Sequence, residues 1–350
     1  MDECAPSSSG SQAYYRILAK SCEAPLHSIW ASPSTLNLLH DNRGFALQRI
    51  GADGSAIDEF TRAIAINPKD EWAFYTRGRS YERLGTVKNA LSDFDTAVKL
   101  APNDSDALRS RAFLNLAVGQ ASKAIADLNR LAVKDAWALH MLALAYAMKD
   151  QCDTALQFAD KALLLGDKSI WPYQVKGECF GKAKHFDDAL SAYDGATLRD
   201  PKDPRPYLDR ANINFRNEKY SDAIEDLSRG LKVIPDNFSL LYQRCYFRAL
   251  SDRQPEGAVI DCNNLLKSFP HSLEVLEARV MAIYRTKQYA MAEQNSTEIL
   301  QQFPNSSTAL YIRGLARKRL GSPLGESDIA SAQDKNASDV SSLIGLGFKP

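Results

Sequence analysis

An alanine returns at the same point of eight successive segments of the chain, each about 34 residues long. The segments begin at Asn37, Glu71, Ser105, Ala136, Ile170, Pro204, Phe238 and Leu273, and a ninth begins at Ser307. A period of about 20–50 residues is typical of repeat architectures, in which each unit packs only on its neighbours. If each first residue is position 1, the alanine stands at position 20, allowing for one inserted residue in the seventh segment: Ala56, Ala90, Ala124, Ala155, Ala189, Ala223, Ala258 and Ala292.

Two further positions recur with the alanine. Position 8 is small or modest in size, and position 32 is usually proline. Two antiparallel helices approach closely where they cross only if the side chains there are small, and a proline ends a helix. We therefore expect each unit to hold a helix A and a helix B that cross at positions 8 and 20. Position 8 is Gly44, Gly78, Ala112, Ala143, Gly177, Ala211, Cys245, Val280 and Gly314, and position 32 is Pro68, Pro102, Pro201, Pro235, Pro270 and Pro304.

The second unit, EWAFYTRGRSYERLGTVKNALSDFDTAVKLAPND, resembles the tetratricopeptide repeat. The resemblance covers residues 37–335. It implies an all-α, right-handed superhelical solenoid of about nine antiparallel helix pairs, with capping helices at the N- and C-terminal ends. The residues of this unit that carry it are Phe74, Gly78, Tyr81, Ala90, Phe94, Ala97 and Pro102.

The ends of the chain lie outside the repeats. Residues 1–12 are polar and rich in Ser and Gly, so we expect them to be disordered. Residues 13–36 are predicted to form an N-terminal cap anchored by Trp30, and residues 336–350 a C-terminal capping segment that shields the last repeat. The third unit is three residues short, which predicts a helix B nearly one turn shorter than the others.

Charged residues repeat in step with the alanine. Position 7 of helix A is usually arginine, and position 23 of helix B is usually acidic. Within one unit the two positions carry opposite charges in six of nine cases, whereas pairing with position 23 of the preceding unit gives four of eight. Matched acids favour structural salt bridges between helices A and B over an arginine ladder that binds phosphates. The predicted bridges are Arg77–Asp93, Arg111–Asp127, Arg210–Asp226 and Arg244–Asp261.

The resemblance also implies that helix A of each unit lines a concave groove through its positions 2, 5, 9 and 12. Aromatic side chains with interspersed Arg, Gln and Asn suit a peptide-binding surface, because they give large apolar contacts and freeze few rotamers. The alternative is that each tryptophan packs back on the preceding helix B as a hydrophobic staple. The candidate groove residues are Trp72, Tyr75, Arg79, Arg109, Phe113, Trp137, His140, Trp171, Gln174, Arg205, Asn212, Tyr242 and Tyr246.

Composition and motifs argue against several classes of function. The chain has 43 basic and 43 acidic residues, whereas nucleic acid and anionic membranes both require clustered basic residues. No apolar run approaches the about 18 residues of a membrane span. The five histidines are scattered, and no metal-ligand spacing, phosphate-binding glycine loop or nucleophile elbow occurs. We therefore expect no catalysis, no metal and no cofactor.

The six cysteines form no CxxC pair. Cys245 and Cys262 stand where the repeat needs small apolar residues, so we expect them to pack in the core. Cys4 and Cys22 could pair in an oxidising compartment, but reduced thiols are the simpler expectation. The N-terminus lacks the apolar core of a signal peptide, which favours a cytoplasmic location, or a periplasmic one if a leader has been removed.

These features together predict a non-catalytic scaffold that binds a peptide or protein in the groove of its repeats. Two alternatives stay open. One is a structural, self-assembling solenoid that forms homo-oligomers, with a homodimer as the simplest case. The other is an RNA-binding helical-repeat protein, which the neutral charge and the recurring alanine and proline argue against.

Overall fold

The computed structural model describes residues 11–22, 32–132 and 135–350, and within these ranges every regular element is a helix. The helices form two compact units, the first ending at Asp167 and the second beginning at Lys168. The predicted disorder of residues 1–12 and the predicted anchor Trp30 fall almost entirely outside the described residues.

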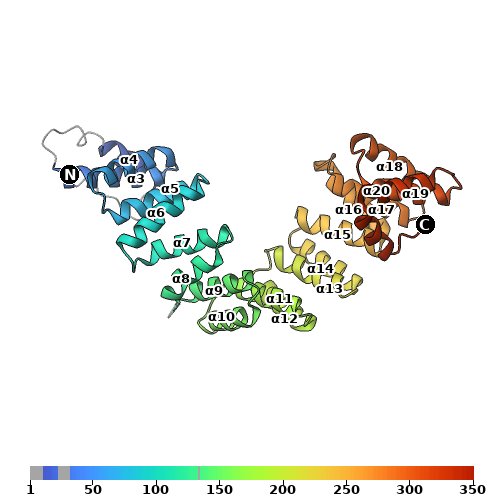
Figure 1. The fold of residues 1–350 in the computed structure, drawn as a ribbon, viewed down its shortest axis with the longest axis horizontal. Helices are drawn as coiled ribbons and strands as arrows, with labels where there is room; N and C mark the ends of the chain where they lie inside the picture. Colours follow the sequence, from blue (N-terminus) through green and yellow to red (C-terminus); the bar gives the residue numbers. More distant parts are fainter. Residues whose placement is uncertain (1–10, 23–31, 133–134) are drawn as a thin grey trace. The chain divides into compact units, whose positions relative to one another are not determined.

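In the first compact unit, a short helix precedes four helix pairs whose members lie side by side and run antiparallel (Figure 1). The short helix is α1 (Gln12–Ser21), which packs on α3. The pairs are α3 (Pro33–Arg49) with α4 (Asp53–Ile66), α5 (Glu71–Arg83) with α6 (Val87–Leu100), α7 (Ser105–Ala117) with α8 (Ala121–Leu131), and α9 (Ala136–Met148) with α10 (Cys152–Leu164).

The second compact unit continues the same pattern with five pairs. They are α11 (Trp171–Lys182) with α12 (Phe186–Arg199), α13 (Arg205–Arg216) with α14 (Tyr220–Val233), α15 (Phe238–Ser251) with α16 (Pro255–Ser268), α17 (Leu273–Arg285) with α18 (Tyr289–Gln302), and α19 (Ser307–Arg319) with α20 (Gly325–Gly345). The prediction of an all-α array of antiparallel helix pairs is confirmed. So is the short third helix B, since α8 has 11 residues and α6 has 14.

Positions 8 and 24 fill each other's space where helix A crosses helix B. A Cβ atom added to Gly78 would lie 2.7 Å from Cε1 of Phe94, so the glycine leaves room for the aromatic ring. Where position 8 is alanine, position 24 is a smaller leucine in two of the units. The eight position-20 alanines are all fully buried beside this crossing. The large-residue pairs are Gly44 with Phe60, Gly78 with Phe94 and Gly177 with Tyr193, and the leucine pairs are Ala112 with Leu128 and Ala211 with Leu227.

Local sequence explains where the helices begin and turn. Acidic or polar residues directly before helix A accept its free N–H groups: the Asp70 carboxylate accepts from the Ala73 N–H at 2.9 Å, and Asn237 accepts from Leu240 at 3.0 Å. Position 15, in the turn between helices A and B, has a positive φ in every unit. Gly85 adopts a φ of 72° there without strain because glycine has no Cβ atom. Lys184 adopts a φ of 62° at the same position, where its Cβ atom makes the conformation energetically costly.

One carboxyl group is buried beside another in the first helix pair. Asp41 of α3 is 6% exposed and lies against Asp70, which also accepts a hydrogen bond from the Asn37 amide at 2.9 Å. Burial, with the nearby Asp70 charge, raises the pKa of Asp41 to about 8. The folded chain therefore holds a proton at Asp41 at neutral pH.

The cysteines differ from expectation. Cys245 and Cys262 occupy positions 8 and 24 of the seventh repeat and are joined by a disulfide, with their Cα atoms 5.5 Å apart. Both are fully buried in the core, as predicted. The sequence analysis did not predict the bond, which forms because the crossing of helices A and B brings the two Cα atoms to the usual distance of a disulfide, about 5.5–6 Å. Cys22, Cys152 and Cys179 are also disulfide-bonded, so the expectation of a reduced Cys22 is wrong.

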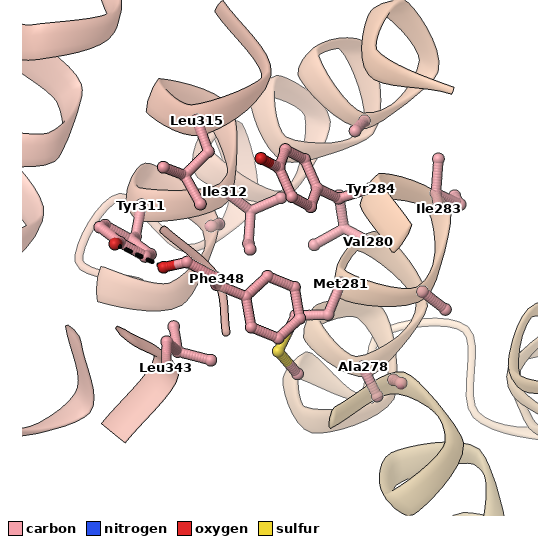
Figure 2. Packing of buried hydrophobic residues seen from close by; sticks show 14 of the residues in the cluster. Ala278, Val280, Met281, Ile283, Tyr284, Tyr311, Ile312, Leu315, Leu343 and Phe348 are labelled. Carbon is pink, nitrogen blue, oxygen red and sulfur yellow. Dashed lines mark hydrogen bonds between the residues drawn. The ribbon is translucent and has the colours of Figure 1, made fainter. Parts of the chain in front are cut away.

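The two ends of the array differ from the predicted boundaries. The first helix A begins at Pro33, ahead of the expected Asn37, because Ser32 provides an N-cap and proline suits the first turn of a helix. At the other end, residues 340–348 pack against α17 and α19 (Figure 2). The C-terminal segment therefore covers side chains of two repeats and not of the last one alone.

Candidate functional site

All four predicted salt bridges between helices A and B are present. Each joins the position-7 arginine to the position-23 aspartate of the same unit. The Nε–Oδ distances are 2.8 Å for Arg77–Asp93, 2.8 Å for Arg111–Asp127, 3.0 Å for Arg210–Asp226 and 2.8 Å for Arg244–Asp261.

These arginines also contact helix B of the preceding unit, but at a position other than 23. The Nη1 atom of Arg77 donates to Thr61 at 3.0 Å, and that of Arg111 bonds Asp95 at 2.9 Å. Thr61 and Asp95 stand at position 25 of the preceding unit. This is two residues after position 23, and at 3.6 residues per turn it lies on a different side of helix B. Arg210 bonds Asp194 in the same way. Each of these arginines thus connects three helices, which makes them structural residues with few donors left for a ligand.

The remaining candidates lie on what we call the helix-A face, meaning the side chains at positions 2, 5, 9 and 12 of each helix A. Two tryptophans on this face stack with arginines from an adjacent helix A. The guanidinium of Arg109 lies 5.0 Å from the ring centre of Trp137, and that of Arg205 lies 4.5 Å from Trp171. Such stacks combine apolar area with a charged group that remains partly in water. Trp171 is 38% exposed.

In the second repeat, packing and exposure are combined. Trp72 contacts rings of the preceding helix pair, 5.9 Å from Phe60 and 6.0 Å from Phe45, as the staple alternative predicts, but it keeps 38% of its surface exposed. One turn on, the Arg79 guanidinium donates to the Tyr75 hydroxyl at 3.1 Å. Trp72 is therefore both a packing residue and a partly open one.

His140 stands at position 5 of its helix A, but it is not exposed on the helix-A face. Its side chain is buried and its Nδ1 bonds the Asp167 carboxylate, so its prediction as a groove residue is wrong. The burial arises because helix α9 is apolar on nearly all sides. Gln174 and Asn212 are half-buried, and Phe113 is 50% exposed. Gln174 bonds Asp209, whose pKa burial raises to about 6.

Tyr242 and Tyr246 lie next to a cavity of about 330 Å³ on the helix-A face of the second compact unit. Their rings stack with centres 6.0 Å apart. The cavity is also lined by the carboxylates of Glu274, Glu277 and Asp339. Burial raises the pKa of Glu277, and Asp339 and Glu274 add to the shift through their charges. This cavity is therefore lined by both aromatic rings and carboxyl groups.

Sequence reasoning missed a second cavity, of about 560 Å³, between α14, α15 and α16. Its apolar wall is made by Phe238 and Phe269, whose ring centres lie 4.6 Å apart, and the Arg244–Asp261 bridge closes its floor. The recurring positions of helix A do not indicate this cavity, because most of its lining residues belong to helices B and to the loops that follow them.

Among residues 11–22, 32–132 and 135–350, no three His, Cys, Asp or Glu side chains are grouped so that they could hold a metal ion. In the same ranges, no helix has the length and apolar character needed to cross a membrane.

Comparison with known proteins gives one family match. A family model described as a tetratricopeptide repeat matches residues 75–140 and 180–237. Ethylene-overproduction protein 1 of Arabidopsis thaliana is 31% identical over 152 residues, which is 43% of this chain and only 15% of that relative's length.

Solved structures resemble the fold at low sequence identity. A tetratricopeptide repeat protein from Parabacteroides merdae has a TM-score of 0.56 and 20% identity, and the match covers 71% of this chain and 99% of the other. The human IFIT1 dimer with m7Gppp-AAAA has a TM-score of 0.46 and 17% identity, covering 96% of this chain and 78% of that one.

Proposed function

We propose that the chain is a non-catalytic scaffold of the tetratricopeptide repeat type, and that its helix-A face binds a peptide or protein partner. The observation that carries the proposal is the set of partly exposed aromatic rings with stacked guanidinium groups on this face. Trp137 with Arg109 and Trp171 with Arg205 are its clearest members. Aromatic residues and arginine dominate the binding energy of protein interfaces.

The bridging arginines are not part of this proposal. Arg77, Arg111, Arg210 and Arg244 direct their donors to aspartates and to the preceding helix B. If these four arginines bound a ligand, their bonds to the aspartates and to the preceding helix B would have to break. The helix-A face, in contrast, offers its aromatic rings without loss of the bonds that hold the helices together.

The test is affinity capture with the full chain, followed by measurement of the affinity for each captured protein. Trp137→Ala combined with Trp171→Ala should weaken that affinity at least ~tenfold, as expected for loss of hot-spot aromatics. Leu164→Ala combined with Leu198→Ala is the matched control, because both leucines are more than 80% exposed on helices B. The control should bind as the wild type does.

Thermal melting separates binding from packing. Unchanged partner affinity with a lowered melting temperature in the double tryptophan variant would show that the rings serve only to pack, and would contradict the proposal. Nuclease treatment of the captured material identifies any RNA partner, and light scattering of the chain alone reports a homodimer.

A further inference from the structure

The C-terminal segment begins with its own helix cap. Within α20, Asn336 leaves the helical conformation, with φ of −156° and ψ of 91°. Its side-chain oxygen accepts from the N–H groups of Ser338 at 3.1 Å and Asp339 at 3.2 Å, which caps a new helical segment. Residues 333–339 are all exposed. Residues 340–348 are therefore joined to the last helix pair through a solvent-exposed link.

The end of this segment makes specific contacts with α17 and α19. Phe348 is fully buried, and its carbonyl oxygen accepts from the Tyr311 hydroxyl at 2.8 Å (Figure 2). The guanidinium of Arg285 lies 3.9 Å from the Phe348 ring centre and donates to the Leu346 carbonyl at 2.6 Å. Figure 2 shows the Phe348 ring between Met281 and the helix that carries Tyr311.

The surface that the segment covers has the same register as the proposed binding face. Tyr311 stands at position 5 of its repeat and Met281 at position 9, and they are 0% and 2% exposed. Phe113, at position 9 of an uncovered repeat, is 50% exposed, and Asn212 at the same position is only half-buried. The segment thus lies where the proposed function places a partner peptide.

We propose that residues 340–348 are a resident ligand of the helix-A face of α17 and α19, and that they must be displaced before another segment can bind there. The inference rests on the proposed function, because it states that access to one part of the same helix-A face is controlled by the C-terminal segment. It also specifies the chemistry of an occupant: an apolar side chain such as Leu343 followed by an aromatic one, with backbone carbonyls that accept from Tyr311 and Arg285. A partner with this chemistry competes with a tethered segment whose effective concentration is about millimolar.

The probe is a labelled synthetic peptide of residues 337–350, titrated into the full-length chain and followed by fluorescence anisotropy. Phe348→Ala removes the buried ring of the resident segment and should tighten peptide binding at least ~tenfold over the wild type. Tyr311→Phe removes only the hydroxyl that donates to Phe348, so it keeps the covered surface folded and should change peptide binding by less than ~threefold. Lys349→Ala, at an exposed neighbour, is the matched control and should bind the peptide as weakly as the wild type.

A third variant locates the site. Adding Met281→Glu to Phe348→Ala places a charge on the covered face and should abolish the gained binding. Circular dichroism of each variant checks that the helices remain folded. If the last helix pair unfolds in Phe348→Ala, the same titration with Leu343→Ala replaces it.

Two results would overturn the inference. One is equal peptide affinity for the wild type and the released variants, and the other is no peptide binding to any folded released variant. Neither result depends on Trp137 or Trp171, so the proposed function could stand while this inference fails. Conversely, tight peptide binding to the released variant together with unchanged partner affinity in the tryptophan variant would support the inference and contradict the proposed function.

Discussion

Substituting Gly78 by alanine tests the packing at the helix crossing. The new Cβ atom would lie 2.7 Å and 2.9 Å from two ring carbons of Phe94 and 3.3 Å from the Ala90 carbonyl oxygen. Non-bonded carbon atoms prefer separations of about 3.5–4.0 Å, so the ring must move by roughly 1 Å. Phe94 is fully buried, and a close-packed core leaves it little space to do so.

The expected magnitude follows from two opposing effects. Overpacking a core costs about 1–3 kcal/mol, and replacing glycine by alanine inside a helix returns at most about 1 kcal/mol. Gly78→Ala should therefore lower the free energy of unfolding by about 1–2 kcal/mol. Phe94→Leu alone leaves a void and should cost about 1 kcal/mol or more. Together they recreate the natural pair Ala112 with Leu128, so the double variant should be more stable than the sum of the single changes predicts.

The assay is urea unfolding of the full chain and its variants, with both midpoint and slope compared. Gly54→Ala is the control, because no atom lies within 4 Å of its added Cβ, and its stability should be unchanged or slightly raised. A wild-type stability for Gly78→Ala, or strictly additive losses in the double variant, would refute the reasoning.

Three further predictions concern charge and cross-linking. Asp93→Ala removes the carboxylate partner of the Arg77 guanidinium and should lower the free energy of unfolding by about 3 kcal/mol. Arg77→Leu with Asp93→Phe recreates the apolar pair of the fourth unit and should cost less. A larger loss in the double variant, measured by urea unfolding, would contradict this. Reducing the Cys245–Cys262 bond, which spans a sequence separation of 17, should cost about 3 kcal/mol, and alkylation without reductant followed by mass spectrometry should label neither thiol. Labelling of both would refute the disulfide, whereas protection would favour an oxidising compartment over the cytoplasm. Because the pKa of Asp41 is raised from 3.8 to about 8, the folded state binds a proton that the unfolded state releases, so stability should fall as pH rises through that range; thermal melts of Asp41→Asn should show a flatter pH dependence, and an unchanged slope would count against the buried carboxyl.

Much of the fold was predictable because it repeats. A residue type that recurs at one register, such as the alanine at position 20, reports the same packing constraint eight times. The salt bridges were predictable for the same reason, since the residues at positions 7 and 23, such as Arg77 and Asp93, vary together from one unit to the next. The pairing of position 8 with position 24 was equally available in the sequence, and only a comparison of side-chain volumes at both positions would have found it.

Other features leave no periodic signal. The docking of Phe348 on Tyr311 occurs once, between segments 37 residues apart in sequence, and depends on where the chain goes after its last repeat. The disulfide of Cys245 and Cys262 was missed because cysteine fits these small, buried positions equally well as a free thiol and as half of a disulfide. For Trp72, register places the side chain on the helix-A face, but the balance of packing and exposure depends on its neighbours.

The central claim is that partners bind to the helix-A face, and site-specific photo-cross-linking tests it most directly. A photoreactive amino acid replaces Phe113, which is 50% exposed on helix A of the third unit, or Leu198, which is 83% exposed on a helix B. Each full-length chain is irradiated with the partner recovered by affinity capture. The account predicts a covalent adduct from position 113 and none from position 198. An adduct from position 198 with none from position 113 would contradict it.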